Sequence, residues 1–423
     1  MNQRTAIIII LVIMTLTMNA DVTPRAQKRL IQQEVSLESF NYKFGDLYYT
    51  PTFYTGLGYD SNSNNSTTSD KDNGYYTETA LGLDFFNQPF RGLTLDTNFI
   101  IGYREGFGNN RNSGLILGSE NGNATIGFDY DLNEKTTLTF VNSASIGMDK
   151  ISDARDNQNS DSRQYWDNDL GVQIHREITD DTGIAVKIGI ETRRDLKDNS
   201  PEEEYDETYF GLTLDHIVNS KLSINPYFNY GERDWKDDTR NNDADITEFG
   251  FTSNYIISDQ INLSLDLAYQ ELDFDNTAIL KSKSSSKQDG FAGGFILSHI
   301  ATEKFTHSIR GSFNNQATTV AISNVSEETQ LGYSSVYLVN EKLSFSASFD
   351  WLHGEDQGNT ANSFEETYDI YMPALGAKYN FTERQSIDIK CEYQNKTSDA
   401  KSFNGNANEY ERTNIFINYT YIF

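Results

Sequence analysis

Apolar and polar residues alternate with a period of two along most of the chain. In residues 92–104 the apolar parity is Leu93, Leu95, Phe99, Ile101 and Tyr103. The opposite parity is polar and holds Thr94, Asp96, Asn98, Gly102 and Arg104. Because successive side chains of a strand point to opposite faces, this pattern predicts a strand with one apolar and one polar face. The pattern recurs at residues 136–149, 260–270 and 342–352.

The same alternation of apolar and polar residues continues from residue 47 to the end. It predicts about eighteen strands, an even number within the range of transmembrane barrels. The expected strands are 47–59, 75–86, 92–105, 114–130, 136–149, 165–178, 183–194, 207–217, 221–234, 246–257, 260–273, 289–300, 304–314, 328–338, 342–353, 366–380, 385–395 and 409–423. The fourth has the least clear pattern, since the apolar phase is lost between Leu115 and Ala124.

Short turns and long loops alternate between these strands. The short turns are tight and polar, and lie at 131–135, 179–183, 218–221, 258–260, 301–304, 339–342 and 382–385. The long connections are polar and mostly acidic, and lie at 60–74, 149–163, 195–206, 236–245, 274–287, 354–363 and 395–407. Tight polar turns between alternating runs are typical of β-hairpins, so the chain is expected to run up and down in antiparallel order.

The length of the strands favours a membrane barrel over a soluble sandwich. Sandwich strands average about six residues, whereas a tilted strand needs about ten to cross a bilayer. A sheet in lipid must also close, because no water satisfies an open edge. We therefore expect an all-β fold, a single transmembrane antiparallel up-and-down β-barrel with short periplasmic turns and long external loops. Trp166, Trp235 and Trp351 lie at the long-loop ends, where an aromatic girdle is expected.

Composition narrows the function classes. The chain has 423 residues, a net charge of −28 and a mean hydropathy of −0.59. These values exclude a helical membrane protein, and the charge disfavours binding of nucleic acid, which needs a basic face. Cys391 is the one cysteine, so neither a disulfide framework nor a multi-cysteine metal site is possible. We interpret Cys391 as a small apolar strand residue.

The N-terminus has the pattern of an export signal. Arg4 precedes an apolar run from Ala6 to Leu16, and Ala20 is small. The alternative, a membrane anchor, needs a longer apolar run. We therefore predict a signal peptide (1–20), a periplasmic N-terminal segment (21–46) with a short helix around 26–33, and an outer-membrane β-barrel (47–423). The expected location is the outer membrane of a diderm bacterium after signal-peptide cleavage.

Charged residues of the polar parity are candidates for lining a pore. They are Asp96, Arg104, Asp129, Lys187, Glu191, Arg193, Arg233, Asp266, Arg310, Asp350, Asp388, Lys390 and Glu392. One interpretation is that they form cross-strand pairs that stiffen the wall. The other is a water-filled pore whose acidic excess attracts cations.

Candidate chemistry is sparse. No two of the five histidines have the spacing of a metal motif, and only His175 clearly has the polar parity. We predict no catalytic residue, no metal and no cofactor, although a triad assembled in space stays possible. Residues 60–65 have the oxygen spacing that opens a calcium loop, but lack its Gly and Glu. We favour a solvated acidic loop over a loop whose carboxylates bind divalent cations shared with lipopolysaccharide.

Two segments resemble known outer-membrane proteins. In the last strand Ile415, Ile417, Tyr419, Tyr421 and Phe423 alternate with Asn414, Phe416, Asn418 and Thr420. This resembles the C-terminal signal read by the barrel-assembly machinery, although Phe416 and Asn418 depart from its pattern. Residues 45–62, with Pro51 in the strand, resemble the first strand of the type-two β-barrel porin family. That resemblance implies a porin-like barrel, often associated with exopolysaccharide export, and no catalytic residues.

Three functions are compatible with the sequence. The first is a passive diffusion channel for small hydrophilic solutes, cation-preferring or linked to polysaccharide export components. The second is a non-conducting structural or surface-interaction barrel, and the third is an outer-membrane enzyme. The expected partners are outer-membrane lipid, lipopolysaccharide and the assembly machinery.

Overall fold

The computed structural model describes most of the chain beyond the N-terminal segment. The described residues are 40–62, 73–90, 92–108, 113–118, 124–148, 164–196, 204–236, 243–274, 287–317, 323–358, 366–399 and 409–423. The expected signal peptide and the helix around residues 26–33 lie outside these ranges. No helix long and apolar enough to cross a membrane occurs in the ranges above.

The described residues form twenty strands in one sheet. In chain order they are β1 (Tyr42–Phe44), β2 (Leu47–Asp60), β3 (Gly74–Phe90), β4 (Leu93–Gly108), β5 (Gly114–Leu117), β6 (Ala124–Asn133), β7 (Thr136–Met148), β8 (Gln164–Thr179), β9 (Thr182–Asp195), β10 (Tyr205–Asn219), β11 (Leu222–Trp235), β12 (Ala244–Ser258), β13 (Ile261–Phe274), β14 (Lys287–Thr302), β15 (Phe305–Ala317), β16 (Ser323–Leu338), β17 (Leu343–Gly358), β18 (Glu366–Thr382), β19 (Gln385–Ser398) and β20 (Tyr410–Ile422).

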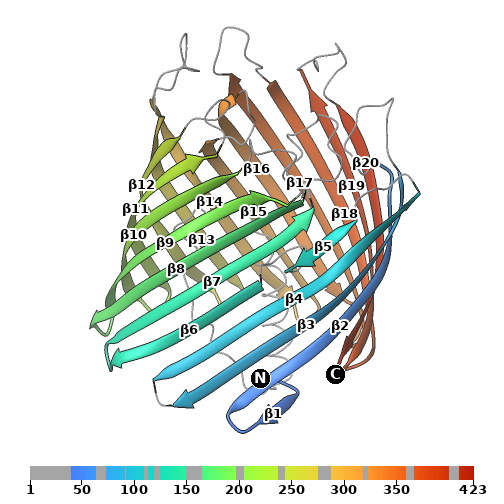
Figure 1. Cartoon of the computed structure of the whole chain (residues 1–423), viewed down its shortest axis with the longest axis horizontal. Helices are drawn as coiled ribbons and strands as arrows, with labels where there is room; N and C mark the ends of the chain where they lie inside the picture. The colour runs from blue at the N-terminus through green and yellow to red at the C-terminus, as the bar shows by residue number, and fades with distance from the viewer. Residues whose placement is uncertain are drawn as a thin grey trace.

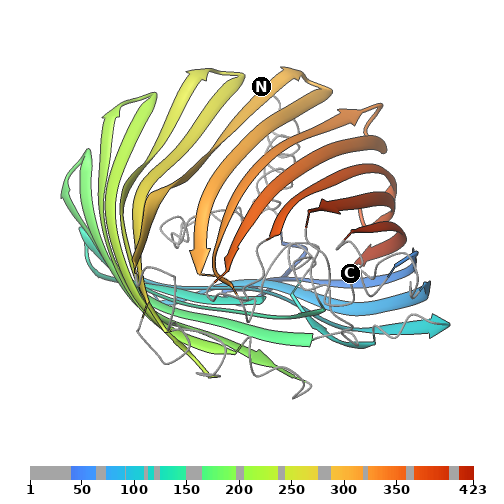
Figure 2. The ribbon, with the colours of Figure 1, turned by 90° about the horizontal axis from the view of Figure 1, so that it is seen from above.

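The sheet closes on itself into a barrel (Figures 1 and 2). Consecutive strands other than β5 and β6 pair in antiparallel fashion, and β2 pairs with β20 to complete the ring. β1 is a short extra strand that pairs only with the start of β2, and β5 and β6 share one position of the wall. The wall therefore has 18 positions, and the expected up-and-down barrel with short hairpin turns is confirmed.

The fourth expected strand, 114–130, is wrong as one continuous element. The structure divides it into β5 and β6, both of which pair with β4. Gly118 follows β5 with a φ of +86°, a conformation that residues other than glycine rarely adopt. The backbone therefore leaves the strand direction at the place where the apolar alternation is lost.

Contacts that skip a strand show which face is concave. Tyr209 on β10 donates a hydrogen bond to Asp169 on β8 at 2.6 Å, and Arg310 on β15 bonds Asp350 on β17 at 2.7 Å. Side chains converge only on the concave side of a curved sheet, so these residues point into the barrel. Residues paired in register share a face, and the polar parity is thereby assigned to the inside all round the wall.

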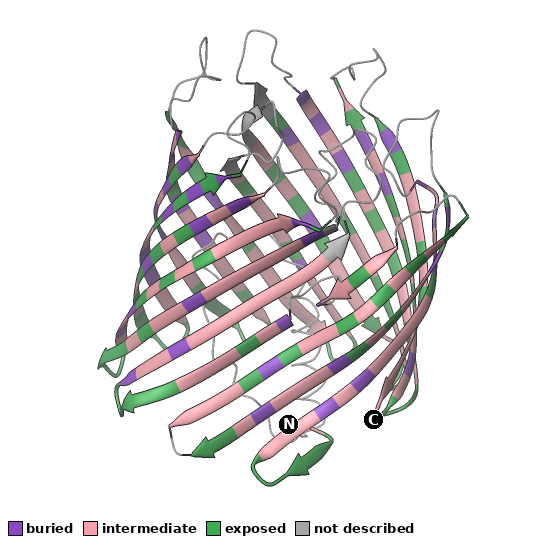
Figure 3. Ribbon diagram, viewed as in Figure 1, coloured by how far each residue is buried: buried purple, intermediate pink, exposed green. Residues whose placement is uncertain are grey.

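The opposite, convex face is apolar and exposed. Large side chains on it include Leu81, Phe249, Phe291 and Leu375, each more than half exposed. Exposed and less exposed positions alternate along the strands (Figure 3). An apolar belt around a closed barrel with a polar interior is the arrangement required in a bilayer, because only lipid covers such a belt without cost.

The proline of β2 is accommodated at the barrel seam. The carbonyl of Pro51 accepts a hydrogen bond of 3.0 Å from the N–H of Phe423. In antiparallel strands the N–H and C=O of one residue point to the same neighbour. The N–H that proline lacks would therefore point toward the end of β20, where pairing stops, and little is lost.

Candidate functional site

The inner wall carries every residue expected to line a pore. Register places on the concave face Asp96, Arg104, Asp129, Lys187, Glu191, Arg193, Arg233, Asp266, Arg310, Asp350, Asp388, Lys390 and Glu392. The structure brings many of them into ion pairs, and their role in conduction stays a prediction.

Long side chains on the inner wall span an intervening glycine. Tyr209 reaches Asp169 across Gly189, and Tyr368 on β18 donates a 2.9 Å hydrogen bond to Glu328 on β16 across Gly354 on β17. A Cβ at either glycine would overlap the tyrosine ring.

The same arrangement occurs twice more. Tyr76 on β3 crosses Gly58 to bond Asn414 on β20 at 2.9 Å, and Arg310 crosses Gly332 to Asp350. The rings and the guanidinium lie along the wall instead of projecting into the lumen. We call these contacts the glycine bridges.

Cations on the inner wall stack over tyrosine rings next to carboxylates. Three hairpins repeat the same group, a Tyr and an acid two residues later on one strand, with an Arg on the next. The groups are Tyr76, Glu78 and Arg104; Tyr165, Asp167 and Arg193; and Tyr205, Glu207 and Arg233. The guanidinium carbons lie 4.2–4.5 Å from the ring centroids. The carboxylate balances the charge of each arginine, and the cation–π contact stabilises the partly or fully buried guanidinium further.

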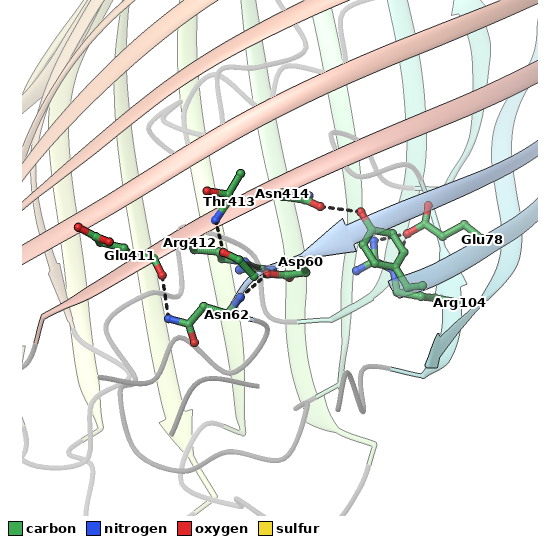
Figure 4. A network of polar contacts seen from close by, with 10 residues as sticks. Asp60, Asn62, Glu78, Arg104, Glu411, Arg412, Thr413 and Asn414 are labelled. Atoms are coloured by element: carbon green, nitrogen blue, oxygen red, sulfur yellow. Dashed lines mark hydrogen bonds and ion pairs between the residues drawn. The ribbon is translucent and has the colours of Figure 1, made fainter. Parts of the chain in front are cut away.

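The barrel seam has its own polar network near the long-loop end (Figure 4). Arg412 on β20 binds the Asp60 carboxylate on β2 through Nε at 3.1 Å and Nη2 at 2.5 Å. The Asn62 backbone N–H donates to Asp60 at 3.0 Å, and its side chain donates to the Glu411 carbonyl at 3.0 Å. These bonds fasten the first barrel strand to the last.

On the β3–β6 side of the inner wall, three neighbouring carboxylates form no ion pair with any described residue. Asp84 on β3 accepts a hydrogen bond from Asn98, and Asp129 on β6 accepts one from Thr139 at 2.5 Å. Asp96 on β4 lies between them in register. We call Asp84, Asp96 and Asp129 the acidic arc.

Solvent reaches the inner wall on the β18–β19 side. The side chains of Lys378 and Lys390 are 50% and 44% exposed, although both point into the barrel. Lys378 lies 3.9 Å from Asp388, and Lys390 lies 2.5 Å from Glu392. Such exposure on a concave face requires a wide space in front of it, so this part of the interior is solvated.

The inner wall is not polar throughout. Ala244, Ile246, Leu272 and Phe274 form a buried apolar cluster at the long-loop ends of β12 and β13, on the same face as Asp266. Trp235 also faces inward, packed edge-on against Tyr205. The expectation that Trp235 belongs to a lipid-facing girdle is therefore wrong, whereas register places Trp166 and Trp351 on the convex face.

The histidines and the acidic start of the first loop have specific partners. His175 Nε2 lies 3.3 Å from Asp215, and among the described residues no serine or cysteine bonds to this imidazole. Both Asp60 oxygens are occupied by Arg412 and Asn62, which leaves them poorly placed to begin a calcium loop. The rest of that loop, residues 63–65, lies outside the described residues.

Sequence reasoning missed several inner residues. Asp84, Glu78 and Glu207 also face inward, and counting by twos along β3 and β10 is the signal that reveals them. The glycine bridges have no signal in one strand alone, because they depend on the curvature of the wall. The spacing of His299 and His307 predicts no shared site, yet the structure places their rings in contact.

Comparison with known proteins finds similar solved structures only. No family model matches the sequence, and no curated protein matches it. OccAB3 of Acinetobacter baumannii and OpdQ of Pseudomonas aeruginosa each have 10% identity and a TM-score of 0.49 over 90% of this chain and 100% of theirs. The outer membrane channel DcaP of A. baumannii has 12% identity and a TM-score of 0.46 over 90% of this chain and 99% of its own.

Proposed function

We propose that this chain is an outer-membrane, porin-like barrel that lets small hydrophilic solutes diffuse passively. The observation that carries the proposal is a closed wall whose convex face is apolar and whose concave face is polar and partly solvated. A bilayer covers the first face and water covers the second. The glycine bridges support the proposal, since they hold large side chains against the wall.

The proposed channel prefers cations. The acidic arc supplies three carboxylates that form no ion pair with any described residue, whereas Arg104, Arg233 and Arg310 are each paired with a carboxylate. Uncompensated charge along a pore raises the local concentration of counter-ions, and the effect weakens with salt. Positive ions therefore pass the β3–β6 side of the wall more readily than anions.

Reversal potentials across planar bilayers in a KCl gradient test both parts of this proposal. The wild-type protein is expected to conduct and to favour K⁺. A D84N/D96N/D129N variant is expected to conduct with a reversal potential closer to zero. Because Glu105, Glu232 and Asp234 lie exposed on the convex face, an E105Q/E232Q/D234N variant is the matched control and should retain the wild-type value.

Two results would contradict the proposal. Absence of single-channel currents from folded protein refutes the pore and favours the non-conducting barrel, for which the inward cluster of Ile246, Leu272 and Phe274 is the supporting observation. Equal reversal potentials in the wild-type and acidic-arc variants refute the cation preference alone.

A link to polysaccharide export is the finer part of the proposal. Its support is the resemblance of residues 45–62 to the first strand of the type-two porin family. Deletion of the gene is expected to lower the exopolysaccharide released by the producing cell. Unchanged release of exopolysaccharide would refute the link to polysaccharide export and leave the channel proposal unaffected.

A further inference from the structure

Two histidines face each other on the convex surface near a short turn. His299 on β14 and His307 on β15 are direct partners in register, two residue pairs from the hairpin's last pair, Thr302 and Phe305. At about 3.3 Å per residue, they lie roughly 10 Å from the hairpin tip. This position is close to the edge of the apolar belt, within reach of water and lipid headgroups.

The two imidazoles are in direct contact. His299 Nδ1 lies 3.0 Å from His307 Nε2, with ring centroids 5.0 Å apart and planes at 67°. The Phe305 ring stacks on His307 at 5.3 Å, and Tyr333 packs at 5.9 Å. These aromatic neighbours fix the His307 ring before any ligand binds.

The separation of the two nitrogens suits adjacent ligands of one metal ion. Imidazole nitrogens bind transition metals at about 2.0–2.1 Å, so two ligands at a right angle lie about 2.9 Å apart. His307 Nδ1 is buried in the wall, which leaves Nε2 as the nitrogen that faces the ion. We propose that His299 and His307 form a two-imidazole binding site for a divalent transition metal ion.

Copper(II) is the ion that fits this site best. It favours nitrogen ligands near right angles, and it binds most tightly among the first-row divalent ions. Both imidazoles bind the ion in the neutral form, with the ring proton of His299 on Nε2 and that of His307 on Nδ1, so that the two facing nitrogens are free of protons. Binding therefore needs no oxidant or reductant. In the described residues no cluster of three or more metal-ligating side chains occurs. Water or a phosphate oxygen from a headgroup completes the coordination.

Sequence spacing does not reveal this site. Seven residues separate the two histidines, and metal motifs on one strand or helix have closer spacing. The hairpin turn at Glu303 and Lys304 brings them together. The inference is independent of the proposed channel, because the site lies on the outside of the wall.

Electron paramagnetic resonance of Cu²⁺ bound to the folded, full-length protein in detergent micelles tests the proposal. At one equivalent, the wild-type spectrum is expected to show hyperfine coupling to two nitrogens. The spectra of H299A and H307A are each expected to show hyperfine coupling to one nitrogen fewer. Both variants should also bind Cu²⁺ at least about tenfold more weakly, since loss of a residue that only orients a metal ligand already lowers metal affinity about 10–100-fold.

His216 provides the matched control. It also lies near a short turn on the convex face, with Thr182 as its partner instead of a second histidine. H216A should leave the spectrum unchanged, and the strand signal in circular dichroism verifies folding of each variant. H299N and H307N replace any alanine variant that fails to fold. Equal Cu²⁺ affinity and spectra in the wild type and both pair variants would overturn the proposal.

Discussion

Replacing Gly354 with alanine tests the glycine bridges. Gly354 lies on β17 beneath the ring of Tyr368, and the ring and hydroxyl of Tyr368 occupy the space that a Cβ needs. Tyr368 is 1% exposed, and its hydroxyl donates a hydrogen bond to Glu328. The new methyl group must therefore push the ring away from the wall and break this bond.

Two costs contribute to the destabilisation. Forcing a methyl group into a packed site costs about 1–3 kcal/mol. A hydrogen bond to a charged acceptor contributes about 1.5–3 kcal/mol. Together these costs lead us to expect that G354A lowers the free energy of unfolding by about 2.5–6 kcal/mol. Y368F loses only the hydroxyl and should cost about 1.5–3 kcal/mol.

Urea unfolding of the protein refolded in phospholipid vesicles measures these differences. G127A is the control, because Gly127 also faces inward but its Cβ would lie 3.3 Å from the nearest atom, a methyl carbon of Val141. G354A introduced into a Y368A background should cost much less than in the wild type, since the ring that it displaces is gone. Equal costs of G354A in both backgrounds would refute the bridge.

Three further predictions concern ion pairs and the seam. D60N removes the carboxylate that Arg412 binds in the buried seam and should lower the free energy of unfolding in urea by about 3–5 kcal/mol. D60L/R412L leaves no unpaired charge and should lower it by less. A double variant less stable than D60N would contradict this explanation. E366Q removes the charge of Glu366, which pairs with Lys396 in a fully buried ion pair, and should lower the free energy of unfolding by about 3–5 kcal/mol. E392Q, beside the exposed Lys390, should lower it by less than about 1 kcal/mol. Similar losses for the two variants would contradict the difference in burial between the two pairs. Deletion of Phe423 removes the N–H bound to Pro51 and should slow barrel assembly in cells, seen as unfolded protein on semi-native gels, whereas unchanged assembly rules out this role.

Parity explains how much of the wall is predictable from sequence. A period of two assigns every strand residue to one face, so the inward positions of residues as distant as Asp96 and Lys390 follow from local alternation. The closure follows from the need to satisfy edge strands in lipid. Neither inference requires knowledge of contacts between distant segments.

The misses arise where local pattern and three-dimensional shape differ. Trp235 shares the parity of Arg233 and faces inward, although its place at a loop end favoured the lipid interface. The contact of Tyr368 with Glu328 skips a strand, so it depends on wall curvature, which one strand does not encode. The division of the expected strand 114–130 depends on Gly118, whose backbone conformation no alternation pattern predicts.

In a transmembrane barrel, one face of each strand meets lipid and the other faces the interior, which is solvated on the β18–β19 side. Nitroxide labels placed singly at residues 387–392 of β19, with Cys391 replaced by serine in every variant except the one labelled there, test this directly by power saturation in reconstituted vesicles. Labels at Ile387, Ile389 and Cys391 should be accessible to oxygen, and labels at Asp388, Lys390 and Glu392 should be more accessible to a water-soluble nickel chelate. A profile without this alternation, or with oxygen favoured at every position, would contradict the barrel orientation described above.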